Sequence, residues 1–163
     1  MKTLVSAGLL ALAPVIALAE APGLTVSDAF ARSANPRSGA AFMTIANAGD
    51  RDCALVGVTA DVVGRAELHT HREENGVMKM VPVDSMTIPA GGTHMLQRGG
   101  DHVMFLALEQ PLTDGQQIGL TLDLGDCGTL PVTIPVDNQR AQAAPAGMQG
   151  GAGAHAGHAM PGN

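Results

Sequence analysis

The feature that most constrains the fold is a run of short apolar segments between Leu24 and Val136. Gly, Pro, Asn and Asp separate these segments at intervals typical of all-β sandwiches and barrels. Apolar residues alternate with others in several segments, for example at Leu120, Leu122 and Leu124. No segment has the pattern of a long amphipathic helix. The run has an ordinary size for one domain, so the sequence predicts a single all-β domain over residues 20–136.

Ten segments have the length and composition of strands. We expect strands at 24–31, 40–47, 54–60, 65–71, 77–83, 86–88, 93–97, 102–108, 117–124 and 130–136. The chain has three Phe and no Trp or Tyr, so the core must be aliphatic. Because methionine commonly fills gaps in such cores, an isolated methionine indicates packing. We interpret Met43 and Met86 in this way.

The first residues have the features of a targeting signal. Lys2 is followed by an apolar run from Leu4 to Leu18, and Ala17-Leu18-Ala19 is a small-x-small cleavage site. The alternative is an uncleaved anchor, but the run is short for a membrane span of about 20 apolar residues. We therefore expect residues 1–19 to be a signal peptide cleaved near Ala19-Glu20. The mature chain is expected to be exported, without a membrane span or lipid anchor.

The composition argues against several functions. The formal net charge is −6 and the few basic residues are scattered, so the chain has no footprint for nucleic acid. An acidic chain of this kind suits a soluble protein that docks on a basic partner. No Ser/His/Asp arrangement, phosphate loop or paired acidic constellation is present in the sequence, so we expect no enzyme activity.

Two cysteines, Cys53 and Cys127, allow two interpretations. An even number of cysteines in a small exported domain favours one disulfide. The alternative is a pair of thiolate metal ligands, but neither cysteine is near the segments of the sequence where His and Met occur together.

The composition changes after Val136. Residues 137–163 consist mainly of Ala, Gly, Gln and Pro, which cannot bury enough apolar surface to fold. This predicted disordered tail carries His155, His158 and Met160. Imidazoles spaced in this way bind Cu(II), nickel or zinc with little discrimination. The alternative is a low-complexity tail whose histidines have no role.

Within the predicted domain, His and Met occur together in three segments. His69 and His71, Met78 and Met80, and His102 and Met104 are each two residues apart. Alternate residues of a strand share a face, so each pair presents two ligands on one side. Thioether sulfur is a soft ligand that selects Cu(I). His94 fits no such pair, and we expect it at an edge or facing solvent.

The first two of these segments are expected to form a hairpin. Asn75-Gly76 is the strongest two-residue turn signal, and it places His71 opposite Met80. A four-residue loop over 73–76 places His69 opposite Met80 instead. In both registers the four His and Met side chains share a face, and the sequence alone does not decide between them.

Four stretches together resemble the periplasmic PCu(A)C copper chaperones. They are Glu67-Leu68-His69, Asn75-Gly76-Val77-Met78-Lys79-Met80, Ile88-Pro89-Ala90-Gly91-Gly92 and Gly99-Gly100-Asp101-His102-Val103-Met104. The family motif is His, ten residues, Met, twenty-one residues, His, one residue, Met. It matches His69, Met80, His102 and Met104 without a gap, and the likeness extends over about Leu24 to Val136.

The resemblance implies a cupredoxin-like (Ig-like) β-sandwich in the periplasm that binds Cu(I) at an exposed site formed by these four residues. It also implies delivery to the CuA centre of the copper subunit of cytochrome c oxidase, together with a Sco-type thioredoxin-fold copper protein. Related chains have His/Met-rich tails that bind Cu(II), as His155, His158 and Met160 would. His71 departs from the motif, as an extra ligand that competes with His69 or holds a second ion.

Three other functions remain as alternatives. An electron-transfer cupredoxin needs a His₂Cys site with a weak axial Met, and neither cysteine has His and Met at that spacing. A periplasmic copper-sequestering or resistance protein would use the same ligands for storage. A β-sandwich interaction module that binds no metal would leave the His and Met side chains dispersed.

Overall fold

The structure is a computed structural model and describes residues 21–140. The strands of this part are β1 (Leu24–Asn35), β2 (Ser38–Asn47), β3 (Cys53–Leu55), β4 (Gly57–Ala60), β5 (Val63–Glu74), β6 (Val77–Pro82), β7 (Met86–Ile88), β8 (Thr93–Leu96), β9 (His102–Leu108), β10 (Gln117–Asp123) and β11 (Thr129–Pro135). A 3₁₀ turn, η1 (Gly125–Cys127), joins β10 to β11. The described residues contain no helix that is long and apolar enough to span a membrane.

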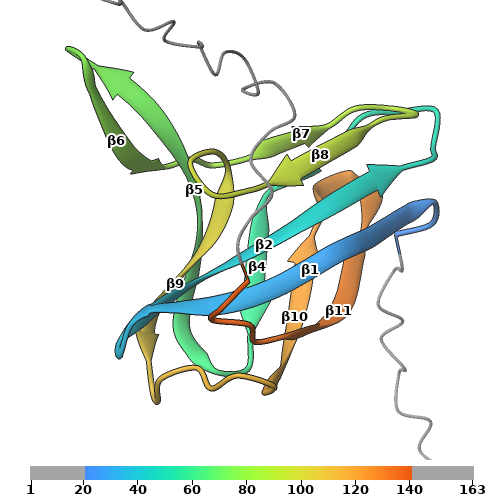
Figure 1. Cartoon of the computed structure of the whole chain (residues 1–163). Helices are drawn as coiled ribbons and strands as arrows, with labels where there is room; N and C mark the ends of the chain where they lie inside the picture. Colours follow the sequence, from blue (N-terminus) through green and yellow to red (C-terminus); the bar gives the residue numbers. More distant parts are fainter. Residues whose placement is uncertain (1–20, 141–163) are drawn as a thin grey trace, which may run out of the picture.

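The strands form two main sheets that face each other, which confirms the predicted all-β sandwich (Figure 1). The larger sheet has the order β1-β2-β9-β5-β6, with β8 also paired to β2. The smaller sheet has the order β11-β10-β4, and β3 pairs with β7 in a short two-stranded ladder. All named strand pairs are antiparallel.

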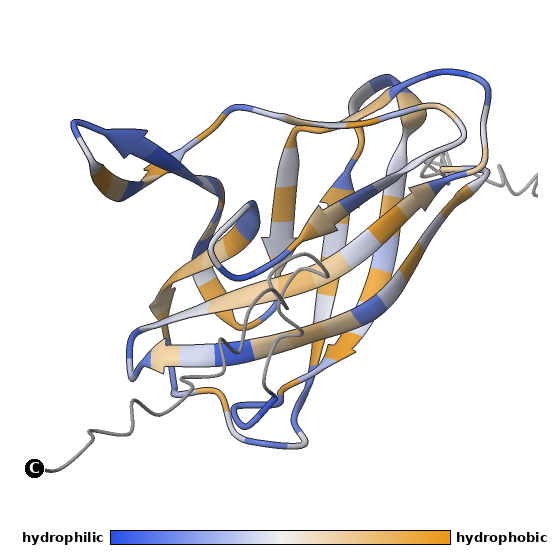
Figure 2. Cartoon of the chain, turned by 45° about the horizontal axis from the view of Figure 1, so that its top comes forward, coloured by the Kyte–Doolittle hydropathy of each residue, from blue (hydrophilic) through white to orange (hydrophobic). Residues whose placement is uncertain are grey.

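The core lies between the two sheets and is mainly aliphatic, as the composition predicts. Apolar residues recur along the strands of both sheets, whereas the loops are mostly hydrophilic (Figure 2). Phe105 and Val103 of β9 are fully buried, and they face Ile118 and Leu122 of β10 across the same core cluster. Removal of such side chains from water is the main driving force for folding. Met43 and Met86 pack in this cluster, which confirms that they are packing residues.

The expected segments mostly correspond to strands, with one clear error. The segment predicted at 54–60 is divided at Val56 into β3 and β4. β3 pairs with β7, whereas β4 pairs with β10, so the chain changes sheets at this residue. Val56 is exposed, and its N–H donates to the carbonyl of Asp123. Composition did not reveal this break because apolar residues continue through it.

The β5–β6 hairpin has the two-residue turn. Asn75 and Gly76 both have positive φ, 54° and 79°, as a type I′ turn requires. Glu74 then pairs with Val77, and His71 lies opposite Met80. The alternative register, with His69 opposite Met80, is wrong, because His69 pairs with Pro82. The hairpin projects beyond the rest of the sandwich (Figure 1).

The predicted signal peptide over residues 1–19 lies outside the described residues, and so do the predicted metal ligands His155, His158 and Met160. Residues 137–140, which composition assigns to the tail, still contact the sandwich. The N–H of Asp137 donates to the carbonyl of Ala31 at 2.8 Å.

The cysteines form the expected disulfide. Cys53 and Cys127 are bonded and 74 residues apart, and the described residues contain no free cysteine. The bond joins β3 to η1, so it ties the short β3–β7 ladder to the smaller sheet. The alternative role as thiolate copper ligands is therefore wrong for this oxidised chain.

A cross-link that closes a loop of this length lowers the conformational entropy of the unfolded chain, which raises its free energy by about 4 kcal/mol. We expect Cys53→Ala with Cys127→Ala to lower the free energy of unfolding by about that amount, measured by urea denaturation. The reduced parent protein is the control, and it should unfold at the same urea concentration as the variant. An unchanged unfolding midpoint in both would show that this cross-link does not support the fold.

Candidate metal centre

The four predicted ligand residues lie on the outer face of the larger sheet. Val103 of β9 and Leu68 of β5 point into the core with exposures of 0% and 4%. Alternate residues point to the opposite side, so His102 and His69 lie on the outer face. The two histidines are paired directly across the strands, and their ring centroids are 5.9 Å apart.

His102 contacts Met80 directly. Its Nε2 is 3.1 Å from the sulfur of Met80, and its Nδ1 is 3.0 Å from the carbonyl oxygen of Gly100. A carbonyl oxygen can only accept, so Nδ1 carries the proton in the neutral ring. Nε2 then has a free lone pair and faces a sulfur lone pair. Both atoms are ligands that a soft cation could bind together.

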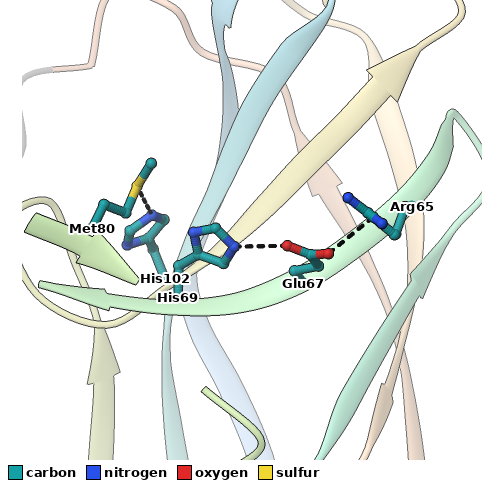
Figure 3. A network of polar contacts seen from close by, with 5 residues as sticks. All are labelled: Arg65, Glu67, His69, Met80 and His102. Carbon is teal, nitrogen blue, oxygen red and sulfur yellow. Dashed lines mark hydrogen bonds and ion pairs between the residues drawn. The ribbon is translucent and has the colours of Figure 1, made fainter. Parts of the chain in front are cut away.

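His69 presents a second free nitrogen. Its Nε2 is 2.9 Å from Oε2 of Glu67, and the other carboxylate oxygen is 2.9 Å from Nε of Arg65. Its Nδ1 is buried and has no hydrogen-bond partner. In Figure 3 this nitrogen is on the side of the ring nearer to His102 and Met80. An orphaned buried acceptor is costly, and a bound cation would satisfy it.

Met104 is the fourth predicted residue, and it shares the outer face with His102, two residues away on β9. It is half-buried and lies opposite Glu67 of β5 and Ala40 of β2. The structure thus brings His69, Met80 and His102 together through close contacts or ring proximity. Met104 is placed beside them by strand register.

His71 lies next to this group. Its Nδ1 is 3.2 Å from the same Gly100 carbonyl that accepts from His102, and the two rings are 5.5 Å apart. The loop between β8 and β9 therefore positions both imidazoles through one oxygen atom. His71 is oriented like His102, with its Nε2 away from Gly100.

An aromatic pair borders the other side of the site. The ring of Phe42 is 6.1 Å from that of His102 and 5.2 Å from that of Phe30. The guanidinium of Arg140 lies over Phe30 at 4.6 Å, within the range of a cation–π contact. The end of the described chain is therefore on the same face as the candidate site.

The remaining His and Met residues are placed differently. His94 lies on β8 opposite the fully buried Ile45, and its Nε2 is 3.0 Å from a carboxylate oxygen of Asp101. The edge position is confirmed, because among the strands of residues 21–140 β8 pairs only with β2, but the solvent-facing alternative is wrong. Met78 and Met95 are exposed.

The donor set fits a soft ion. Within residues 21–140, no group of three or more His, Cys, Asp or Glu side chains is placed to hold a metal. At this face the sulfur of Met80 lies 3.1 Å from Nε2 of His102, so a thioether stands beside the imidazoles. Zinc, calcium and magnesium do not favour thioether ligands, whereas Cu(I) does.

Sequence reasoning missed the groups that orient the imidazoles. Glu67 and Arg65 contact the site through His69, and the Gly100 carbonyl contacts two histidines. Alternation along β5 was a usable signal, because Arg65, Glu67 and His69 share a face. A backbone carbonyl has no such signal in the sequence.

Comparison with known proteins identifies the family. Residues 24–136 match the model of the LpqE-like family, described as putative lipoprotein LpqE-like. The chain belongs to this family. A curated relative, the putative lipoprotein Lxx21020 of Leifsonia xyli subsp. xyli (strain CTCB07), is 37% identical over 118 residues, which cover 72% of this chain and 71% of the relative.

Solved structures agree with the fold. The solution structure of apo-DR1885 from Deinococcus radiodurans is 36% identical with a TM-score of 0.56, and it covers 85% of this chain and 94% of that one. The Cu(I)-DR1885 structure is 38% identical with a TM-score of 0.54, covering 73% and 83%. The copper-bound PCuAC domain from PmoF2 has a TM-score of 0.61 at 16% identity, covering 76% and 99%, and shows the fold alone. The LpqE-like chain is a cupredoxin-like (Ig-like) sandwich.

Burial of His102 affects its protonation. Burial lowers the pKa of His102 below its ordinary value of 6.5, and nearby His71 and His69 lower it further, against the raising effects of the Gly100 hydrogen bond and Asp101. As pH falls, His102 is therefore protonated at a higher pH in the unfolded chain than in the folded chain. The free energy of unfolding therefore falls as pH drops through the window between 6.5 and the lower folded value.

We expect the ring resonances of His102 in the metal-free protein to titrate with a midpoint below 6.5. Proton–carbon NMR spectra of the imidazoles, recorded as a function of pH, measure this midpoint. A histidine in a short unstructured peptide in the same buffer provides the reference. A midpoint at or above 6.5 would contradict the burial of the ring on this face.

Proposed function

We propose that this LpqE-like protein is a periplasmic copper chaperone that binds Cu(I) through His69, Met80, His102 and Met104. The observation that carries the proposal is the 3.1 Å contact between Nε2 of His102 and the sulfur of Met80, beside the unpartnered Nδ1 of His69. The Cu(I) structure of DR1885, at 38% identity, supports the same cargo.

The site has one buried and one exposed side, which suits ligand exchange. His69 and His102 are buried at 8% and 4% exposure, whereas Met80 is 46% exposed. The imidazoles would hold the ion against the sheet, and the thioether of Met80 would be the ligand that an acceptor replaces. Binding and release in this way break no covalent bond, so we propose a carrier without enzyme activity.

The acceptor that we propose is a Sco-type thioredoxin-fold protein or the CuA centre of the oxidase copper subunit. A thiolate-bearing acceptor could displace Met80 from the exposed side, because thiolates are strong soft ligands for Cu(I). A sequestering protein would use the same ligands but would retain the ion. Transfer of Cu(I) from the loaded chain to a separate thiolate protein distinguishes these two functions.

An electron-transfer role has less support. A blue copper centre needs a cysteine thiolate, and both cysteines of the chain are in the disulfide. We therefore propose that added Cu(II) produces no intense blue colour.

Two secondary parts of the proposal concern additional ligands. His71 could replace His69 or hold a second ion, since it stands beside His102 and shares its hydrogen-bond acceptor. We also propose that His155, His158 and Met160 bind a second copper as Cu(II). A chain that ends at Arg140 would separate this second site from the first.

The thioethers are expected to determine affinity for Cu(I). We expect Met80→Leu together with Met104→Leu to abolish tight binding while the fold is retained, because leucine keeps the apolar volume but has no sulfur. Competition with a Cu(I) chelator measures the affinity, and circular dichroism measures the fold. The matched control is Met78→Leu, which changes an exposed methionine on the same hairpin. Unchanged affinity in the double variant would overturn the proposed ligand set.

A further inference from the structure

Three alternate residues of β5 form a chain of polar contacts along the outer face. Nε of Arg65 is 2.9 Å from Oε1 of Glu67, and Oε2 of Glu67 is 2.9 Å from Nε2 of His69 (Figure 3). Arg65 is 67% exposed at its side chain, Glu67 27% and His69 11%. The chain of contacts thus runs from solvent to a buried imidazole.

This arrangement determines which nitrogen of His69 carries the proton. A carboxylate paired with a guanidinium is an acceptor only, so Nε2 of His69 must donate to it. In the neutral imidazole the other nitrogen is then an acceptor with a free lone pair. That nitrogen is Nδ1, which is buried and unpartnered.

His102 is oriented in the opposite sense. Its Nδ1 donates to the Gly100 carbonyl, which leaves Nε2 free beside the sulfur of Met80. The two facing histidines therefore have opposite tautomers. Nδ1 is closer to the backbone than Nε2, so His69 would bind an ion close to the sheet, whereas His102 would reach outward to it.

From these contacts we propose that Glu67, supported by Arg65, is a positioning residue that fixes the Nε2–H tautomer of His69 and makes Nδ1 its copper-binding atom. Carboxylates that accept from the second nitrogen of a ligating histidine orient the ring and raise its basicity. The effect of Glu67 on copper affinity rests on the proposed function, whereas the tautomer of His69 does not.

The geometry is tested first in the metal-free protein. Long-range proton–nitrogen NMR of the labelled chain, above the titration range of its imidazoles, distinguishes the two tautomers. We expect the Nε2–H pattern for His69 and the Nδ1–H pattern for His102. The Nδ1–H pattern for His69 would overturn the proposal, whether or not the chain binds copper.

The consequence is tested with three variants of the full chain. Glu67→Ala removes the acceptor and should lower Cu(I) affinity about 10- to 100-fold, the usual effect of losing such a partner. Glu67→Gln keeps an amide oxygen that can accept from Nε2, so most of the affinity should be retained. Glu73→Ala is the matched control, because it removes the same charge from the same face of β5, and its affinity should equal that of the parent.

These outcomes separate positioning from simple charge attraction. Equal losses in Glu67→Ala and Glu67→Gln would show that only the negative charge matters and would overturn the proposal. Parent-like affinity in Glu67→Ala would overturn it as well, while leaving the copper function intact. If the parent itself does not bind Cu(I), the proposed function fails, and the NMR result still decides the role of Glu67.

Discussion

The pairing of β5 with β9 is the constraint on which the candidate site depends. His69 is opposite His102 in this register, and Leu68 is opposite Val103. Leu68 and Val103 are buried in the core. A slip by one residue would move these aliphatic side chains to the outer face and bring the imidazoles into the core. The hydrophobic core therefore fixes the relative positions of two nitrogen ligands that lie on the other side of the sheet.

Hydrogen bonds fix the proposed imidazole ligands in position, whereas the proposed thioether ligand Met80 is on an exposed hairpin. Hydrogen bonds to Glu67 and to the Gly100 carbonyl orient the two buried imidazoles. Met80 comes from the hairpin that projects beyond the sandwich, and its side chain is about half exposed. Thioether ligands are neutral and flexible, so Met80 can move without leaving an unpaired charge. A rigid pair of imidazoles and an accessible sulfur together suit a protein that must bind an ion and then release it.

Much of this arrangement could be predicted from the sequence because it depends on local rules. Alternation placed His102 with Met104, and Asn75-Gly76 indicated the two-residue turn that sets His71 opposite Met80. Long-range geometry could not be predicted in this way. The change of sheets at Val56 depends on which strand each half meets. The contact of one Gly100 carbonyl with both His71 and His102 depends on how the β8–β9 loop folds back. No local sequence pattern indicates this loop conformation or the change of sheets.

The central claim is that both imidazole and thioether ligands hold one Cu(I) ion on the outer face of the larger sheet. X-ray absorption spectroscopy of the Cu(I)-loaded chain counts sulfur and nitrogen ligands directly. With a chain that ends at Arg140, so that the C-terminal His and Met residues do not contribute, we expect two sulfur and two nitrogen ligands. A spectrum with nitrogen or oxygen ligands alone would contradict the account.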